Sequence, residues 1–240
     1  MIRNVSIKLL GICFFVLTLG TVAGWLITED LAGERKGEAM LLAGGLVSLL
    51  IFIVQSVLFL SAGKRVFTQL LFLTSGIFSA AWFMFCLFAP LLWIDSIMFE
   101  VKLLMVTGLV LLSGSNVVES FRRFDEKWNS QQDSVRDEKL RREGKLIDWD
   151  GLIRSMDLSI SIYIPGMPPG VCVAVSMLMV ASMLAGFFLK NIFPLFSAFA
   201  WGVPSALVVT LFFQVAGYNA AQACRVKSLE QTFKLKFEHK

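Results

Sequence analysis

Residues 9–28 read LLGICFFVLTLGTVAGWLIT, twenty consecutive positions without an acidic or basic side chain. An α-helix of about 20 apolar residues crosses the roughly 30 Å hydrocarbon core of a bilayer. A charge at the centre of such a helix costs roughly 2.5–3.5 kcal/mol on insertion scales, so a long uncharged run indicates a membrane span. The run is too long for a signal peptide and continues into Glu29–Asp30 without a clear cleavage site, so we expect it to be retained.

The rest of the chain has the same character. Of its 240 residues 56% are hydrophobic and 17% charged, and the mean hydropathy is +0.72. A soluble domain carries about 25% charged residues, which excludes that class here. Five further uncharged regions follow the first: Ala39–Gly63, Val66–Ile94, Leu103–Val118 (completed from near Ile97), Leu158–Leu189 and Asn191–Cys224. The predicted fold class is therefore an all-α polytopic integral membrane protein with six transmembrane helices.

The distribution of basic residues predicts the orientation of the helices. With the N-terminus inside, eighteen Lys and Arg residues lie on the cytoplasmic side and four on the other. Cytoplasmic loops carry the excess of basic residues, so we predict that both termini are cytoplasmic, in a bacterial inner membrane. The predicted organisation is transmembrane helices 1–4 in residues 1–118, a cytoplasmic helical segment in 119–165, transmembrane helices 5–6 in 166–224 and a basic tail in 225–240.

The polar segment 119–165 carries two apolar stripes at helical spacing. The first continues the fourth span, and the second is an amphipathic pattern from Leu146 to Tyr163. This second stripe predicts a helix that either lies on the membrane surface or, as we favour, packs on the chain itself or on a partner. A short strand within Leu158–Ile164 is a further alternative. The candidate partner-contact residues are Phe121, Phe124, Trp128, Leu146, Trp149, Ile153 and Met156.

Residues 165–170 read PGMPPG and precede the fifth span. Proline lacks a backbone N–H, so these residues do not belong in a helix interior. We expect a rigid elbow that starts the span near Val171; the alternative is a re-entrant element that lines a cavity.

Small and polar residues within the spans predict contacts between helices. Gly20 and Gly24, like Gly217 and Ala221, are four residues apart, a spacing that permits close helix approach inside the chain or in an oligomer. Four neutral polar side chains are candidates either for hydrogen bonds between helices, which we favour, or for the lining of a pathway: Gln55, Gln69, Asn116 and Gln214.

The sequence offers few groups for chemistry. The one histidine is His239, and the four cysteines lack metal-ligand spacing, so we expect no metal site and no cofactor. Bases and acids are mixed in the polar segment, so we expect no nucleic-acid binding. The predicted partners are membrane lipids and other membrane proteins or a second copy of the chain.

Three functional hypotheses remain. The favoured one is a non-catalytic membrane protein that acts through protein–protein contacts, as a subunit of a membrane machine or as an exclusion- or immunity-type blocker. The alternative is a channel or uncoupled carrier formed by an oligomer. A membrane enzyme acting on lipid ranks third, because only Glu29, Asp30, Asp95 and Glu100 are available outside to form an acidic site.

Overall fold

A computed structural model describes residues 7–63, 65–130, 146–156, 160 and 162–239. The helices are α1 (Ile7–Ala32), α2 (Glu34–Ala62), α3 (Val66–Phe88), α4 (Pro90–Trp93), α5 (Phe99–Ser130), α7 (Trp149–Arg154), α8 (Pro169–Leu189) and α9 (Pro194–Phe233). Two short strands, β1 (Leu146–Ile147) and β2 (Glu238–His239), pair in parallel. The all-α fold class predicted from the sequence is confirmed apart from this two-residue ladder.

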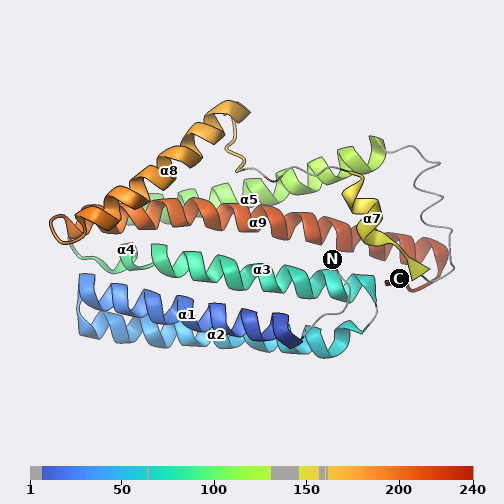
Figure 1. Cartoon of the computed structure of the whole chain (residues 1–240), viewed down its shortest axis with the longest axis horizontal. Helices are drawn as coiled ribbons and strands as arrows, with labels where there is room; N and C mark the ends of the chain where they lie inside the picture. The colour runs from blue at the N-terminus through green and yellow to red at the C-terminus, as the bar shows by residue number, and fades with distance from the viewer. Residues whose placement is uncertain (1–6, 64, 131–145, 157–159, 161, 240) are drawn as a thin grey trace.

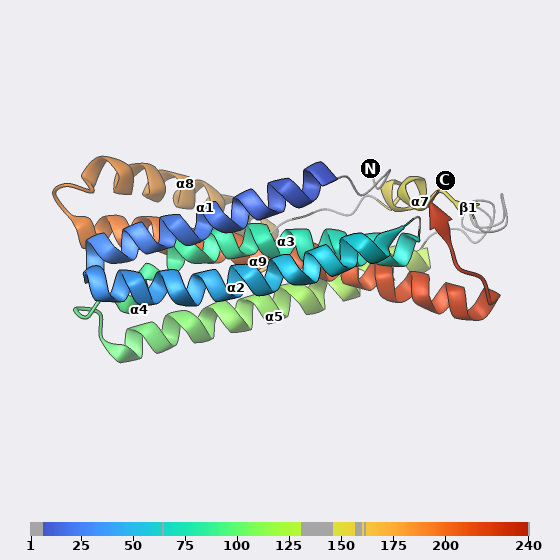
Figure 2. The same cartoon turned by 90° about the horizontal axis from the view of Figure 1, so that it is seen from below.

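The long helices run side by side along one axis (Figure 1). The two central helices are α3, which contacts α1, α2 and α9, and α9, which contacts α3, α5 and α8. One end of the bundle, called here the polar end, carries α7, β1 and β2; the opposite end carries α4 and the turns α1–α2 and α8–α9 (Figures 1 and 2). Helix α8 leans away from α9 as it leaves their common turn (Figure 1).

Among the described residues, five helices are long and apolar enough to cross a membrane. They contain the first, second, third, fourth and sixth predicted spans, which supports a membrane protein. Helix α8 has 21 residues, but only its second part, Met177–Leu189, is described throughout as an apolar helix. This part is shorter than a membrane span. The fifth predicted span, the total of six spans and the orientation of the bundle therefore stay predictions.

Prolines and glycines separate the helices. Pro90, Pro169 and Pro194 stand in the first turns of α4, α8 and α9, where a missing N–H breaks no helical hydrogen bond. Only Ala89 separates α3 from α4, and together they form one apolar helical stretch, Val66–Trp93, which matches the third predicted span. Gly33 separates α1 from α2 with a φ of 92°, a conformation that side chains other than glycine rarely adopt.

The elbow before α8 is present. The N–H of Met167 donates to the carbonyl of Ile164 at 3.1 Å, Gly166 has a φ of 80°, and α8 begins at Pro169. This turn matches the expected elbow and places the start of the helix two residues before the predicted Val171.

The predicted amphipathic helix over 146–163 is wrong as a single helix. Residues 146–147 form β1, only Trp149–Arg154 is helical, and residues 160 and 162–164 are neither helix nor strand. The carboxylate of Asp148 accepts from the N–H of Gly151 at 2.9 Å and starts α7, which ends within two turns. The alternative strand in 158–164 falls partly on residues 158–159 and 161, which lie outside the described part. Residues 131–145 of the first predicted helix also lie outside it.

Candidate functional site

An apolar cluster lies at the polar end of the bundle, where α3, α5, α7 and α9 meet. Its buried members, the polar-end cluster, are Val66, Leu70, Phe124, Trp128, Ile147, Trp149, Leu152, Met156, Tyr218, Ala221, Ala223, Val226 and Phe237. Trp149 is fully buried; its ring centroid lies 5.9 Å from that of Trp128, and its Nε1–H donates to Oε1 of Gln222 at 3.1 Å. This cluster attaches α7 and the C-terminal residues to the helical bundle.

The candidate partner-contact residues belong mostly to this cluster. Phe124, Trp128, Trp149 and Met156 are buried in it, while Phe121 and Ile153 are half-buried at its edge. The side chain of Leu146 lies outside the described part, although its backbone pairs with Glu238. Of the two kinds of packing that we favoured, the structure shows packing within the chain, and contact with a partner stays a prediction.

The sequence pattern missed several members of the cluster. Leu152 is fully buried, but it is off the stripe of Trp149, Ile153 and Met156. Phe237 of the basic tail is also buried, and its N–H donates to the carboxylate of Glu230 at 2.9 Å. The signal for it in the sequence was the weakly amphipathic pattern of Val226, Leu229, Phe233 and Phe237 in the tail.

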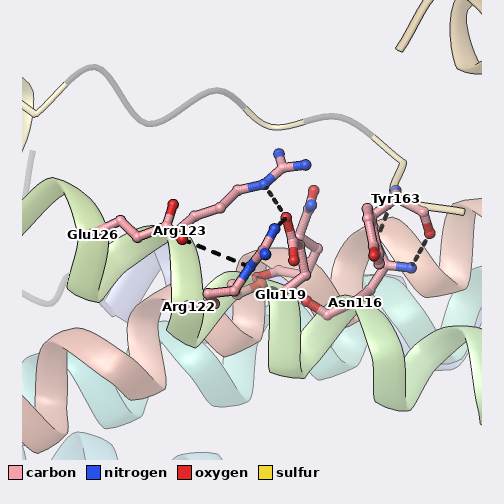
Figure 3. A network of polar contacts seen from close by, with 8 residues as sticks. Asn116, Glu119, Arg122, Arg123, Glu126 and Tyr163 are labelled. Atoms are coloured by element: carbon pink, nitrogen blue, oxygen red, sulfur yellow. Dashed lines mark hydrogen bonds and ion pairs between the residues drawn. The ribbon is translucent and has the colours of Figure 1, made fainter. Parts of the chain in front are cut away.

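A polar network on α5 holds the extended residues that precede the elbow (Figure 3). The side-chain amide of Asn116 donates to the carbonyl of Tyr163 at 2.9 Å, and its Oδ1 accepts from the N–H of Tyr163 at 3.1 Å. The guanidinium of Arg123 lies 5.8 Å from the centre of the Tyr163 ring and donates to the buried carboxylate of Glu119 at 2.7 Å. A second arginine, Arg122, also pairs with Glu119, at 2.9 Å. The network therefore joins residue 163 to α5 by both backbone and side chain.

Replacing Asn116 with leucine tests this attachment. We expect Asn116→Leu to destabilise the segment around Tyr163 by roughly 1–3 kcal/mol, because two backbone groups lose their partner. Hydrogen exchange at the Tyr163 amide should become faster. Ser115→Ala is the control, since that hydroxyl bonds only its own helix, at Leu112. Equal exchange in the two variants would contradict the role of Asn116.

The other three neutral polar candidates also lie within helix contacts. Gln55 of α2 is fully buried and donates to the Ser75 carbonyl of α3 at 2.8 Å and to the Ser79 hydroxyl. Gln69 donates to the carbonyl of Gly63 at 3.1 Å. The backbone carbonyl of Gln214 accepts from the hydroxyl of Ser120 at 2.8 Å, which joins α9 to α5. The side-chain bonds of Gln55 and Gln69 are of the kind that the favoured interpretation predicts. The bond at Gln214 involves its backbone, so the role of that side chain stays a prediction, and no conducting role has been tested.

A groove in the apolar part of the bundle lies between α2 and α5. Its volume is about 740 Å³, and side chains of α3 and α9 form its floor. The lining is almost entirely apolar: Ile51, Phe78, Ala81, Trp82, Phe85, Leu109, Val110, Ser113, Gly114, Val117, Val118, Val209 and Phe213. We call this the α2–α5 groove.

One hydroxyl group in the α2–α5 groove has no hydrogen-bond partner among the described residues. Ser113 is 7% exposed, and its Oγ is buried and unbonded. Two neighbours on the same helix, Ser115 and Ser120, donate to backbone carbonyls of α5 at 2.9 and 2.7 Å, the usual arrangement for serine in a helix. Beside Ser113, Gly114 has no atom within 4 Å of where a Cβ would stand. The groove thus combines an unsatisfied polar group with open space.

In the described residues, no group of three Asp, Glu, Cys or His side chains is placed to hold a metal ion. This includes the four carboxylates that were considered for an enzyme. Asp95 pairs with the ammonium of Lys36 at 2.5 Å, and this contact holds the pKa of the Asp95 carboxyl below its usual value. Lys36 also donates to the carbonyl of Trp93 at 3.1 Å. Asp95 therefore connects the start of α2 to the residues that follow α4.

Comparison of the chain with protein-family models, with curated protein sequences and with solved structures finds no match. No family is therefore assigned; in its described residues the chain is a helical protein with five helices long and apolar enough to cross a membrane.

Proposed function

We propose that this chain is a non-catalytic integral membrane protein that binds another membrane protein, and that one transmembrane helix of the partner occupies the α2–α5 groove. The proposal includes six spans with both termini in the cytoplasm of a bacterial cell. The observation that carries it is the Ser113 hydroxyl, buried in the groove with no hydrogen-bond partner among the described residues.

A helix suits the groove better than a lipid chain does. Lipid tails are as apolar as the groove walls, so apolar contact alone does not favour protein over lipid. A hydroxyl group in an apolar medium is stabilised by a hydrogen bond, which an acyl chain cannot provide and a polar side chain of a helix can. The open space at Gly114 permits a second helix to approach α5 closely, as small residues do at helix interfaces in membranes.

Photo-crosslinking in native membranes tests the proposal. A photoreactive residue at Val110 or Val117, both in the groove, should give a protein adduct, whereas one at Leu46 of α2, which is 70% exposed and outside the groove, should not. Mass spectrometry of the adduct identifies the partner, and an adduct of twice the chain's mass would indicate a second copy. Adducts with lipid alone would contradict the proposal.

A leucine at position 114 separates binding from folding. In Gly114→Leu, the new Cβ has no atom of the described residues within 4 Å, and the rest of the side chain enters the groove. We therefore expect the crosslink to be lost while the thermal stability stays unchanged. Gly45→Leu, at another glycine with no atom within 4 Å, should keep both. If Gly114→Leu crosslinks as the parent chain does, the partner helix is not in this groove.

The alternative function, a channel or uncoupled carrier, has less support. It requires polar side chains along a path, whereas Gln55, Gln69 and Asn116 each donate to carbonyls of the chain itself. Ion or solute flux through the purified chain in liposomes would favour it.

A further inference from the structure

A second cavity lies at the opposite end of the bundle and shares no residue with the α2–α5 groove. Its volume is about 530 Å³. The lining comes from the end of α1, the junction of α3 and α4, and the α8–α9 turn: Leu26, Ile27, Asp30, Leu31, Leu87, Pro90, Leu91, Lys190, Pro194, Ser197, Ala198 and Trp201. The cavity is thus apolar with one acidic and one basic side chain, the two ionisable groups in its lining.

The acidic side of the cavity has an unfavourable surplus of negative charge. Asp30 lies in the last turn of α1, and no basic residue is present in that turn. The carbonyl groups at the C-terminus of a helix carry a partial negative charge, so a carboxylate there is repelled and a cation is favoured. A bound ammonium group would stabilise this end of α1.

The basic side of the cavity has the opposite character. Lys190 follows α8 and is held near α9 by a tight turn, in which the N–H groups of Ile192 and Phe193 donate to the carbonyl of Leu189 at 3.0 and 2.8 Å. Helix α9 begins at Pro194 without a side-chain cap and without an acidic residue in its first turn. The free N–H groups at the start of a helix, and its positive dipole end, favour an anion such as a phosphate.

The rest of the cavity suits hydrocarbon. Leu91 is buried, and its side chain fills the space that a Cβ on Gly202 of α9 would need, so the wall between α4 and α9 is closely packed. Leu26, Ile27 and Leu31 of α1 form the facing wall. An occupant therefore needs an apolar body, a cationic group and an anionic group close together.

We propose that this cavity binds a phospholipid with a primary-amine headgroup, with the ammonium at Asp30 and the phosphate at Lys190 and the start of α9. Such a headgroup carries both charges on adjacent groups, and its ammonium donates hydrogen bonds to a carboxylate. A choline headgroup carries no N–H donor, and a glycerol headgroup carries no positive charge. The chemistry of Asp30 therefore selects among phospholipids, whereas Lys190 binds the phosphate that they share.

Lipid binding to the detergent-purified full chain, measured by native mass spectrometry, tests the site. We expect phosphatidylethanolamine to bind roughly three- to tenfold more tightly than phosphatidylglycerol or phosphatidylcholine, the range for charge-assisted hydrogen bonds at a partly exposed site. Asp30→Asn should remove this preference, and Lys190→Gln should weaken the binding of all three lipids. Equal binding of the three lipids to the parent chain would overturn the proposal.

Two matched variants at the same end serve as controls. Glu100→Gln and Lys102→Gln change the same charges on α5, outside the cavity lining, and should leave the lipid preference unchanged. Without added lipid, the free energy of unfolding should change by no more than about 1 kcal/mol in any of the four variants, the size of a charge effect at a helix end, which separates lipid selection from folding. If Glu100→Gln removes the preference as Asp30→Asn does, the effect arises from surface charge and the cavity is not the site.

Discussion

Replacing Trp149 with alanine is expected to destabilise the polar end by roughly 3–5 kcal/mol, the range measured for truncating large buried aromatic residues. Trp149 is fully buried against Trp128, and it supplies the donor for Gln222. The alanine variant would leave a cavity where α3, α5, α7 and α9 meet, and it would leave Oε1 of Gln222 without the Trp149 donor. The free energy of unfolding in detergent and hydrogen exchange across α7 measure this loss.

Two further variants separate the contributions of the Trp149 side chain. Trp149→Phe keeps most of the apolar contact but removes the Nε1–H donor, and should cost about 1–3 kcal/mol. Phe233→Ala is the control, because that ring is 52% exposed, and it should cost less than about 1 kcal/mol. If Trp149→Ala costs no more than Phe233→Ala, α7 is not held to the bundle as the structure shows.

The second large effect is expected at the contact between α1 and α3. A Cβ on Gly20 would stand 2.8 Å from the Cα of Phe83, a backbone atom that cannot move without shifting α3. We expect Gly20→Leu to cost roughly 1–3 kcal/mol or more by overpacking. At 2–4 °C per kcal/mol for a chain of this size, the melting temperature should fall by about 2–12 °C.

Gly11→Leu is the matched control for Gly20→Leu. Both glycines lie on α1, but a Cβ at Gly11 meets no atom within 4 Å, so its variant should melt within about 2 °C of the parent chain. An equal loss in the two variants would mean that leucine at any position of α1 is destabilising, and would contradict close packing at Gly20.

Gly20 and Gly24 show what the sequence left open about small residues. Their spacing predicted a close helix contact, inside the chain or in an oligomer. In the structure both glycines face helices of the same chain: the nearest atoms belong to Phe83 of α3 for Gly20, and to Met40 of α2 and Cys86 of α3 for Gly24. Spacing specifies which face of a helix permits close approach, but the partner helix is set by how the whole bundle packs.

The cluster around Trp149 shows a second limit of sequence patterns. A stripe at spacing 3 and 4 predicted one long amphipathic helix. In the structure, the apolar side chains buried here come from the short strand β1, from the six-residue helix α7 and from Phe237, which lies far away in the sequence and precedes β2. Periodicity assumes continuous helix geometry. Here Asp148 starts a new helix, and Asn116 binds the backbone of Tyr163 outside any helix, both of which override the pattern.

The sequence alone determined that this chain is helical and apolar enough for a membrane, and it located the starts of five long helices within about five residues. That information is local, because twenty uncharged residues in a row satisfy their backbone groups in lipid only as a helix. Only the tertiary structure decided which faces meet, that Trp149 and Phe237 share one cluster, that Ser113 lies in a groove with no hydrogen-bond partner among the described residues, and that Asp30 and Lys190 line one cavity. These features join residues distant along the chain, and their positions depend on the packing of every helix between them.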